Sequence, residues 1–226
     1  MNIDYTLIRS NRKTVAIYIR DGLVKVRAPQ EMSLKDIERF VLSKDSWITK
    51  KLAQSTSAVR KREAFELDYG SVVHYRGQQY PIVAQDSDKM GFDGSAFFLP
   101  HGLSLDNIKT AVIEIYKLLA KRDLSEKVNR FASLMLVKPN ALKINSAKTR
   151  WGSCSAKKRL NFSWMVMMAD DECIDYLVVH ELAHLIQLNH STRFWDIVRR
   201  NCPDYLECQS RLKKLQQRIN DEDWDL

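Results

Sequence analysis

The sequence contains no long hydrophobic run. A helix that crosses a bilayer needs about 20 consecutive apolar residues, whereas the longest apolar stretches here, such as Thr14–Ile19 and Trp164–Ala169, are much shorter. The first residues also lack the basic start and unbroken apolar segment of a secretory signal, because Asp4 is followed by Arg9 and Lys13. We therefore expect a cytoplasmic protein that does not contact a membrane.

Closely spaced cysteine pairs are also missing. The four cysteines form no CxxC motif, which argues against a zinc ribbon. In a reducing compartment we expect them to be free thiols. The chain also has no glycine-rich phosphate-binding loop, and only seven glycines among its 226 residues. Because 45% of the residues are hydrophobic, a chain of this length can bury a substantial core.

Positive charge is in excess, but it is not concentrated. The 36 lysines and arginines outnumber the 28 acidic residues, which gives a net charge of +8. Short basic clusters occur along the whole chain, at 50–51, 60–62, 157–159 and 199–200, while the C-terminus is acidic. This dispersion favours a solvated surface over a nucleic-acid-binding stripe. The charge still leaves a nucleotide or nucleic-acid partner open.

The first hundred residues are typical of strands with one helix. Asp-Gly at 21–22 lies between two β-rich runs and predicts a hairpin. Ser33 is placed as the N-cap of an amphipathic helix that we expect to run to about Ala53. A second hairpin is predicted around Gly77, and a short strand should end at Pro100. We therefore expect residues 1–102 to form a β-rich N-terminal region.

From Ser104 onward, helical periodicity dominates. The pattern predicts a long helix that continues past Phe131, strands at 142–148 and 160–167, and then three further helices. The first of these three begins after Asp170-Asp171 and contains the apolar positions up to Leu188. The expected fold class is α+β, with residues 103–226 as the catalytic part.

The segment that carries the chemistry lies in the helix predicted after Asp170-Asp171. Three of the five histidines, His180, His184 and His190, fall within eleven residues. Residues four apart lie on one face of a helix, so His180 and His184 can present two imidazoles to one ion. Glu181 follows the first ligand directly, where it can take a proton from metal-bound water. The HExxH pattern therefore indicates a zinc hydrolase site.

His190 fits this site only if the helix ends before it. Six residues of continuous helix turn through about 600°, which would place His190 away from His184. Asn189 suits a left-handed helix end, and Ser191 can cap the next helix. Three protein ligands with one open position are typical of catalytic zinc. We therefore predict one zinc ion per chain, held by the three histidines.

Four segments around these residues resemble the YgjP-like metallopeptidase family, a zincin group similar to the SprT-like and minigluzincin proteases. These segments are 150–155, 175–184, 189–191 and 194–195. The resemblance implies a zinc-binding helix packed on a small sheet, with His180, His184 and His190 as ligands. The sequence departs from neighbouring groups, because Gln187 stands where metzincins have glycine and no cysteine pair provides the zinc ribbon of SprT-like proteins.

Residues upstream of the motif and within its helix are candidates for substrate binding. Arg150, Trp151, Ser153 and Tyr176 are predicted to line the cleft, where the 150–155 segment can add an extended substrate as a strand. Trp151 is also open to a packing role, and Gly152 to a role in a tight bend. In the same way, Cys154 is open as a fourth zinc ligand, Asp196 as a partner of a ligand histidine, and Phe194 and Trp195 as packing residues.

Three functions agree with this sequence. The first is a zinc metallopeptidase that uses zinc-activated water, with Glu181 as general base, on a peptide or protein substrate. The second keeps the zinc but hydrolyses a phosphate-containing substrate such as a nucleoside triphosphate. The third is a non-catalytic nucleic-acid-binding module with structural zinc. The motif favours the first.

Overall fold

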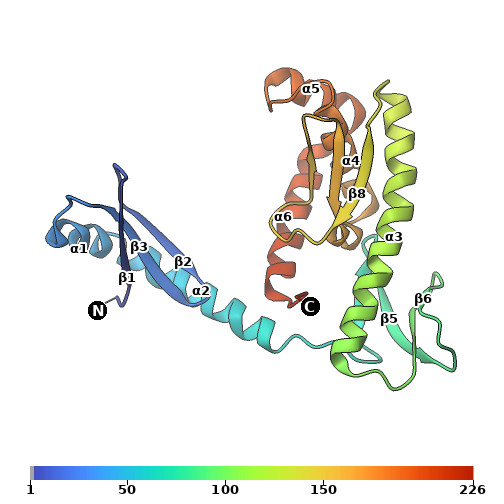
Figure 1. Ribbon diagram of the computed structural model, residues 1–226, viewed down its shortest axis with the longest axis horizontal. Coiled ribbons are helices and arrows are strands. Elements are labelled where there is room, and N and C mark those ends of the chain that lie inside the picture. Colours follow the sequence, from blue (N-terminus) through green and yellow to red (C-terminus); the bar gives the residue numbers. More distant parts are fainter. Residues whose placement is uncertain (1–2, 226) are drawn as a thin grey trace. The chain divides into compact units, whose positions relative to one another are not determined.

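The computed structural model describes residues 3–225, and its contacts divide the chain into two compact units (Figure 1). The first unit comprises the chain up to Phe65 together with Ile219–Asp223, and the second comprises Glu66–Arg218 together with the last described residues. The boundary at residue 102 lies inside the second unit, between the last strand of one sheet and a long helix. It stays a prediction about where the catalytic part begins.

The first unit is a three-stranded sheet with two helices. The central strand β3 pairs in parallel with β1 and antiparallel with β2. Asp21 and Gly22 have φ values of 50° and 72°, so they form the predicted hairpin turn. Val26 and Ile37 are fully buried in the core of this unit. Its elements are β1 (Thr6–Ser10), β2 (Ala16–Arg20), β3 (Leu23–Pro29), α1 (Leu34–Leu42) and α2 (Asp45–Glu63).

The helical part of this unit differs from the prediction. Ser33 does cap α1, since its hydroxyl accepts a hydrogen bond from the backbone N–H of Asp36. The single helix expected up to Ala53 is wrong, however, because α1 ends at Leu42 and α2 continues to Glu63. The Ser43 hydroxyl bonds the carbonyl of Phe40, a local contact that competes with helical continuation.

The second unit begins with a four-stranded sheet of order β4-β5-β7-β6. The hairpin predicted around Gly77 is confirmed, with Arg76 and Gly77 both at positive φ. β5 then pairs in parallel with β7, whose residue Phe97 is fully buried. The strands are β4 (Val72–Tyr75), β5 (Gln78–Gln85), β6 (Gly91–Phe92) and β7 (Phe97–Pro100).

The rest of the second unit packs helices against a three-stranded sheet of order β8-β10-β9. The 30-residue helix α3 runs beside β8 and α4 (Figure 1). β9 pairs antiparallel with β10 and leaves its other side as the edge of the sheet. The elements are α3 (Leu105–Leu134), β8 (Ala141–Asn145), β9 (Gly152–Cys154), β10 (Arg159–Ser163), η1 (Trp164–Met168), α4 (Asp171–Ala183), α5 (Thr192–Asn201) and α6 (Tyr205–Asp221).

The strand predicted for 160–167 is correct only in its first half. β10 ends at Ser163, whose hydroxyl accepts a hydrogen bond from Met165 N–H and starts the short 3-10 helix η1. Every residue of η1 is buried, and Trp164 stacks on Tyr116 of α3 with ring centroids 5.2 Å apart. A short apolar run gives no periodicity that separates a strand from a buried helical turn.

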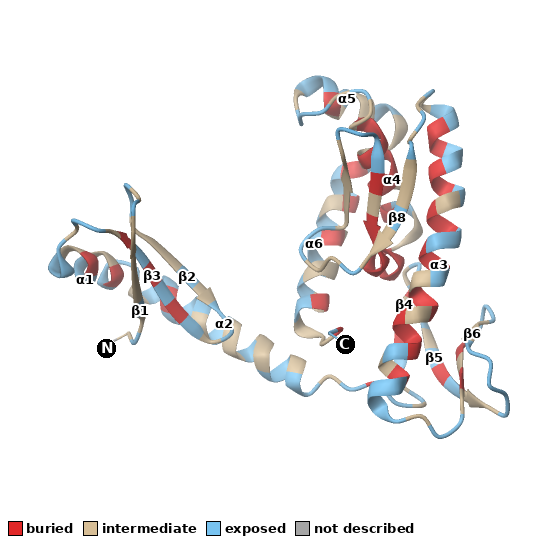
Figure 2. Ribbon diagram, in the orientation of Figure 1, coloured by how far each residue is buried: buried red, intermediate tan, exposed pale blue. Residues whose placement is uncertain are grey.

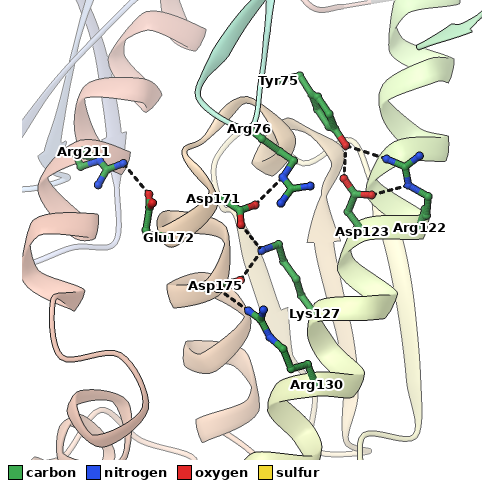
Figure 3. A network of polar contacts seen from close by, with 10 residues as sticks. All are labelled: Tyr75, Arg76, Arg122, Asp123, Lys127, Arg130, Asp171, Glu172, Asp175 and Arg211. Carbon is green, nitrogen blue, oxygen red and sulfur yellow. Dashed lines mark hydrogen bonds and ion pairs between the residues drawn. The ribbon is translucent and has the colours of Figure 1, made fainter. Parts of the chain in front are cut away.

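A buried lysine joins α3 to α4 (Figure 3). The ammonium of Lys127, on α3, lies 2.5 Å from a carboxylate oxygen of Asp175 and 3.0 Å from one of Asp171, both on α4. Arg76, in the turn between β4 and β5, adds a 2.6 Å contact to Asp171, and Arg130 adds one of 2.6 Å to Asp175. Because the Lys127 side chain is only 7% exposed, this cluster fixes the position of α4.

The α+β class expected from the sequence is therefore confirmed. α4 is buried along most of its length (Figure 2).

The four cysteines are free thiols. Among the described residues, no helix is both long and apolar enough to cross a bilayer.

Replacing Lys127 by methionine should destabilise the protein. The variant leaves two partly buried carboxylates without their shared lysine, although Arg76 and Arg130 still partner them. We expect the free energy of unfolding to fall by about 2 kcal/mol, less than for a fully buried pair. Urea unfolding measures this change. Lys121→Met, an exposed site on the same helix, is the control, and equal stability of the two variants would contradict the account.

Candidate metal centre and active site

The helix α4 presents the HExxH residues at its C-terminal end. Asp170 occupies its N-cap position. Asp171 and Glu172 place negative charge in the first turn, where it interacts favourably with the helix dipole and stabilises the helix. The helix ends at Ala183, with His184 as its C-cap. The rings of His180 and His184 are 5.1 Å apart. The predicted common face for these two histidines is therefore present.

The helix ends earlier than predicted, and Asn189 does not end it. The backbone N–H groups of Ile186 and Gln187 both bond the carbonyl of Ala183, which closes a tight turn directly after α4. Asn189 is not among the described residues with positive φ, so the left-handed helix end predicted for it is wrong. Instead its side chain accepts a 2.7 Å hydrogen bond from Gln187. Side-chain and backbone bonds within the turn replace the expected cap.

This turn brings His190 to the other two histidines. The Nε2 atoms of His190 and His180 are 3.2 Å apart, and the rings of His190 and His184 are 4.8 Å apart. One ligand atom from each of the three residues lies within 4.8 Å of the others. Ser191 occupies the N-cap of α5 as predicted, although its hydroxyl makes no capping bond.

One buried aromatic ring packs under all three imidazoles. Phe194, on α5, is fully buried, and its ring centroid lies 4.9, 4.6 and 4.7 Å from those of His180, His184 and His190. Trp195 stacks on His190 at 5.8 Å. The packing role that the sequence left open for this pair therefore agrees with the structure.

Three neutral imidazoles are a donor set that suits zinc, and one pair of their nitrogens already has the spacing of zinc ligands. In a tetrahedral site with Zn–N bonds of about 2.05 Å, two ligand nitrogens lie about 3.3 Å apart, and the Nε2 atoms of His180 and His190 are 3.2 Å apart. Burial, together with His184 and His190, lowers the pKa of His180 to about 4. Burial and His190 also lower the pKa of His184. Both rings are therefore neutral near pH 7, which is the form that binds metal.

The ring nitrogens on the other side of these histidines also have partners. His184 Nδ1 lies 3.3 Å from the carbonyl oxygen of Gln187. His180 Nδ1 lies 3.4 Å from the hydroxyl of Tyr176, which in turn accepts a 3.0 Å hydrogen bond from Gln209. Such contacts fix the ring orientation and tautomer of ligand histidines. They leave the Nε2 atom of His180 directed towards His190.

Glu181 is buried beside the first ligand, with 5% of its surface exposed. Burial raises the pKa of Glu181 to about 7, and the charge of Arg150 acts in the opposite direction. The carboxylate lies against β9, because a Cβ added at Gly152 would stand 2.7 Å from its Oε1 atom. Gly152 therefore permits a close approach to Glu181, which differs from the bend that the sequence indicated.

A cavity of about 590 Å³ adjoins His180 and Glu181, a size within the usual range for ligand sites. Of the four predicted substrate-binding residues, Arg150, Trp151 and Tyr176 line it. Ser153, on β9, does not. The opposite wall is formed by α6 residues, among them Gln209 and Lys213, which the sequence analysis did not identify because helical spacing alone does not reveal which face meets a distant site.

The two remaining candidates lie outside this group. Cys154 does not belong to the three-residue ligand cluster among the described residues, and both burial and the charge of Glu181 raise the pKa of its thiol. Asp196 is half exposed and lies 3.4 Å from Arg199. Asp196 is therefore a solvated surface acid, and not the partner of a ligand histidine that the sequence left open.

Replacing Tyr176 by phenylalanine should weaken zinc binding, because His180 would lose the partner of its Nδ1 atom. We expect an affinity loss of about tenfold. Competition with a chromophoric chelator measures it. Tyr205→Phe is the matched control, since the Tyr205 ring stacks on Trp195 and packs near Tyr176 without contacting a histidine nitrogen. An unchanged affinity in Tyr176→Phe would show that this hydroxyl does not position the ligand.

The solved structures that this chain resembles include two metallopeptidase zymogens. The crystal structure of abylysin from Pyrococcus abyssi is 23% identical, with a match that covers 42% of this chain and 90% of that chain at a TM-score of 0.35. That of jannalysin from Methanocaldococcus jannaschii is 26% identical, with coverage of 41% and 97% and a TM-score of 0.36. No curated protein matches this chain in sequence.

A family model gives a far longer match. The model is described as YgjP-like, metallopeptidase domain, and it matches residues 13–215. This range includes the HExxH helix, the turn that follows it, His190 and the α6 wall of the cavity. The matched range covers most of the first unit as well as the second. The chain therefore belongs to the YgjP-like metallopeptidase family.

Proposed function

We propose that this metallopeptidase is zinc-dependent, with one zinc ion held by His180, His184 and His190 and with Glu181 as general base. The observation that carries the proposal is the convergence of the three histidines on one point beside a buried carboxylate and an open cavity. Three protein nitrogens leave one position for water or substrate, which is the usual arrangement of catalytic zinc.

Each residue then has a defined task. Zinc held by His180, His184 and His190 would supply Lewis-acid chemistry, which would lower the pKa of a bound water molecule and polarise a peptide carbonyl. Glu181 accepts the proton of the attacking water and passes it to the leaving amine. Phe194 and the hydroxyl of Tyr176 hold the imidazoles in place.

The edge strand β9 is suited to hold an extended peptide. Ser163 N–H bonds the carbonyl of Trp151, and Ser155 N–H bonds the carbonyl of Arg159, so both ends of β9 are paired with β10. Because backbone groups alternate along a strand, those of Gly152 and Cys154 face the free edge. A peptide that adds to this edge passes beside Glu181, which supports a peptide bond as the substrate.

The two alternative functions stay predictions. Hydrolysis of a nucleoside triphosphate would use the same zinc site, and a nucleic-acid module would use zinc only for structure. The sequence contains no glycine-rich phosphate-binding loop that would support the first alternative. The second alternative does not explain why Glu181 is buried beside the ligands, because a structural zinc site needs no general base.

Replacing Glu181 by glutamine should abolish hydrolysis while zinc stays bound, because glutamine keeps the shape of the side chain but accepts no proton. We expect kcat to fall by about 10²- to 10⁴-fold. Zinc content and turnover of a peptide library and of nucleoside triphosphates are measured together, and the substrate consumed by the wild type separates the first two functions. Glu172→Gln, on the exposed first turn of α4, is the control. Unchanged turnover in Glu181→Gln would contradict the proposal.

Replacing Gly152 by alanine should also reduce kcat, because the added methyl group would overlap the Glu181 carboxylate. A displacement of about 1 Å at a reacting group costs about 100-fold in rate. Zinc content should stay at the wild-type level, since the atoms that the methyl group would meet most closely all belong to Glu181 and not to a histidine. Ser153→Ala, at the next position of the same strand, controls for changes to β9, and equal rates for the two variants would argue against the close approach.

A further inference from the structure

The face of α6 that lines the cavity beside Glu181 has an unusual composition. Four polar residues at spacings of four, three and one contribute to it, and none of them is acidic: Gln209, Lys213, Gln216 and Gln217. This spacing places them on one side of the helix. Leu212 and Trp151 add apolar surface to the same cavity. The cavity wall therefore offers amide groups, a cation and apolar contacts.

The charges around this cavity are one-sided. Arg150 and Lys213 are its cations, whereas its one acidic residue is Glu181, which the proposed reaction uses as base. Both cations are exposed, and neither forms an ion pair within the described part of the chain. By contrast, Arg211, also on α6, contacts Asp170 and Glu172. Arg150 lies close enough to Glu181 for its charge to act on that carboxylate, and Lys213 adds a second positive charge. The cavity thus has an excess of positive charge close to the reacting groups.

We propose that the substrate of this site is a peptide with an acidic side chain close to the bond that is cut, bound by Arg150 and Lys213. The proposal rests on the peptidase function proposed above and adds its specificity. A carboxylate fits a guanidinium through two hydrogen bonds and an ammonium through one. Gln209 already donates to Tyr176, and Gln216 donates to the carbonyl of Lys148. We therefore assign to Gln217 the contact with the peptide backbone, which an extended substrate on β9 presents on its other side.

A nucleic acid is the other polyanion that two cations attract, but the cavity suits it less well. Single-stranded nucleic acid is bound by a groove of cations that follows successive phosphates and by aromatic rings that stack on its bases. Here amides occupy three of the four polar positions of the α6 wall. The aromatic rings of the lining are Trp151, Tyr176 and the ligand His180, and the Tyr176 hydroxyl already contacts His180 and Gln209. These features match a single carboxylate better than a chain of phosphates.

The test compares peptides that differ only in one residue next to the cleaved bond, which is glutamate, glutamine or lysine. We expect the wild-type zinc enzyme to cut the glutamate peptide with a kcat/KM about tenfold above that for the lysine peptide, as one partly solvated charge pair allows. Lys213→Glu should remove or reverse this preference. Lys214→Glu makes the same charge change on the adjacent residue, which lines a separate cavity, and should keep the preference.

Binding to a protein that does not turn over separates this proposal from the peptidase proposal. Fluorescence anisotropy of the labelled peptides on zinc-loaded Glu181→Gln should show about tenfold tighter binding of the glutamate peptide, lost when Lys213→Glu is added. If this holds while the wild type cuts no peptide, the acidic-peptide site stands and the peptidase function fails. Equal binding of all three peptides would overturn the proposal, as would displacement of the glutamate peptide by an equimolar oligonucleotide.

Discussion

The packing of Phe194 against three imidazoles is the contact on which the site depends. His180 and His184 come from α4 and its C-cap, whereas His190 lies beyond a turn, so no single helix places all three. Phe194 is fully buried, with its ring centroid less than 5 Å from that of each histidine. The docking of α5 therefore fixes the third histidine.

The position of α4 is fixed from two other directions. Lys127 holds its first half through Asp171 and Asp175, and a buried cation shared by two carboxylates tolerates little displacement. At the other end of α4, Gly152 lets β9 approach Glu181 so closely that even an added methyl group would displace the Glu181 side chain. The carboxylate, the edge strand and the cavity are thereby held at one place. Such rigidity favours catalysis, because reacting groups must keep a fixed distance and orientation relative to the bound substrate.

Local features of this protein were predictable from its sequence, and long-range ones were not. The spacing of His180 and His184 sets their common face, and Asp21-Gly22 sets a hairpin, because both depend only on neighbouring residues. The end of α4 was misplaced because apolar spacing continues to Leu188, whereas the backbone N–H groups of Ile186 and Gln187 close a tight turn on the carbonyl of Ala183. The strand predicted for 160–167 is wrong from Trp164 onward, because the burial of Trp164 against Tyr116 decides the conformation of that half. The roles of Gly152 and of the α6 wall arise only when distant segments meet.

X-ray absorption spectroscopy at the zinc edge of the purified wild-type protein tests the central claim most directly. It reports which atoms surround the metal and at what distance. The account predicts nitrogen and oxygen neighbours only, at about 2.0–2.1 Å, with the multiple-scattering signal of about three imidazoles. A sulfur neighbour at about 2.3 Å would instead place Cys154 in a closed, structural site. That result, or a protein that binds no zinc when the metal is supplied, would contradict a catalytic site of three histidines.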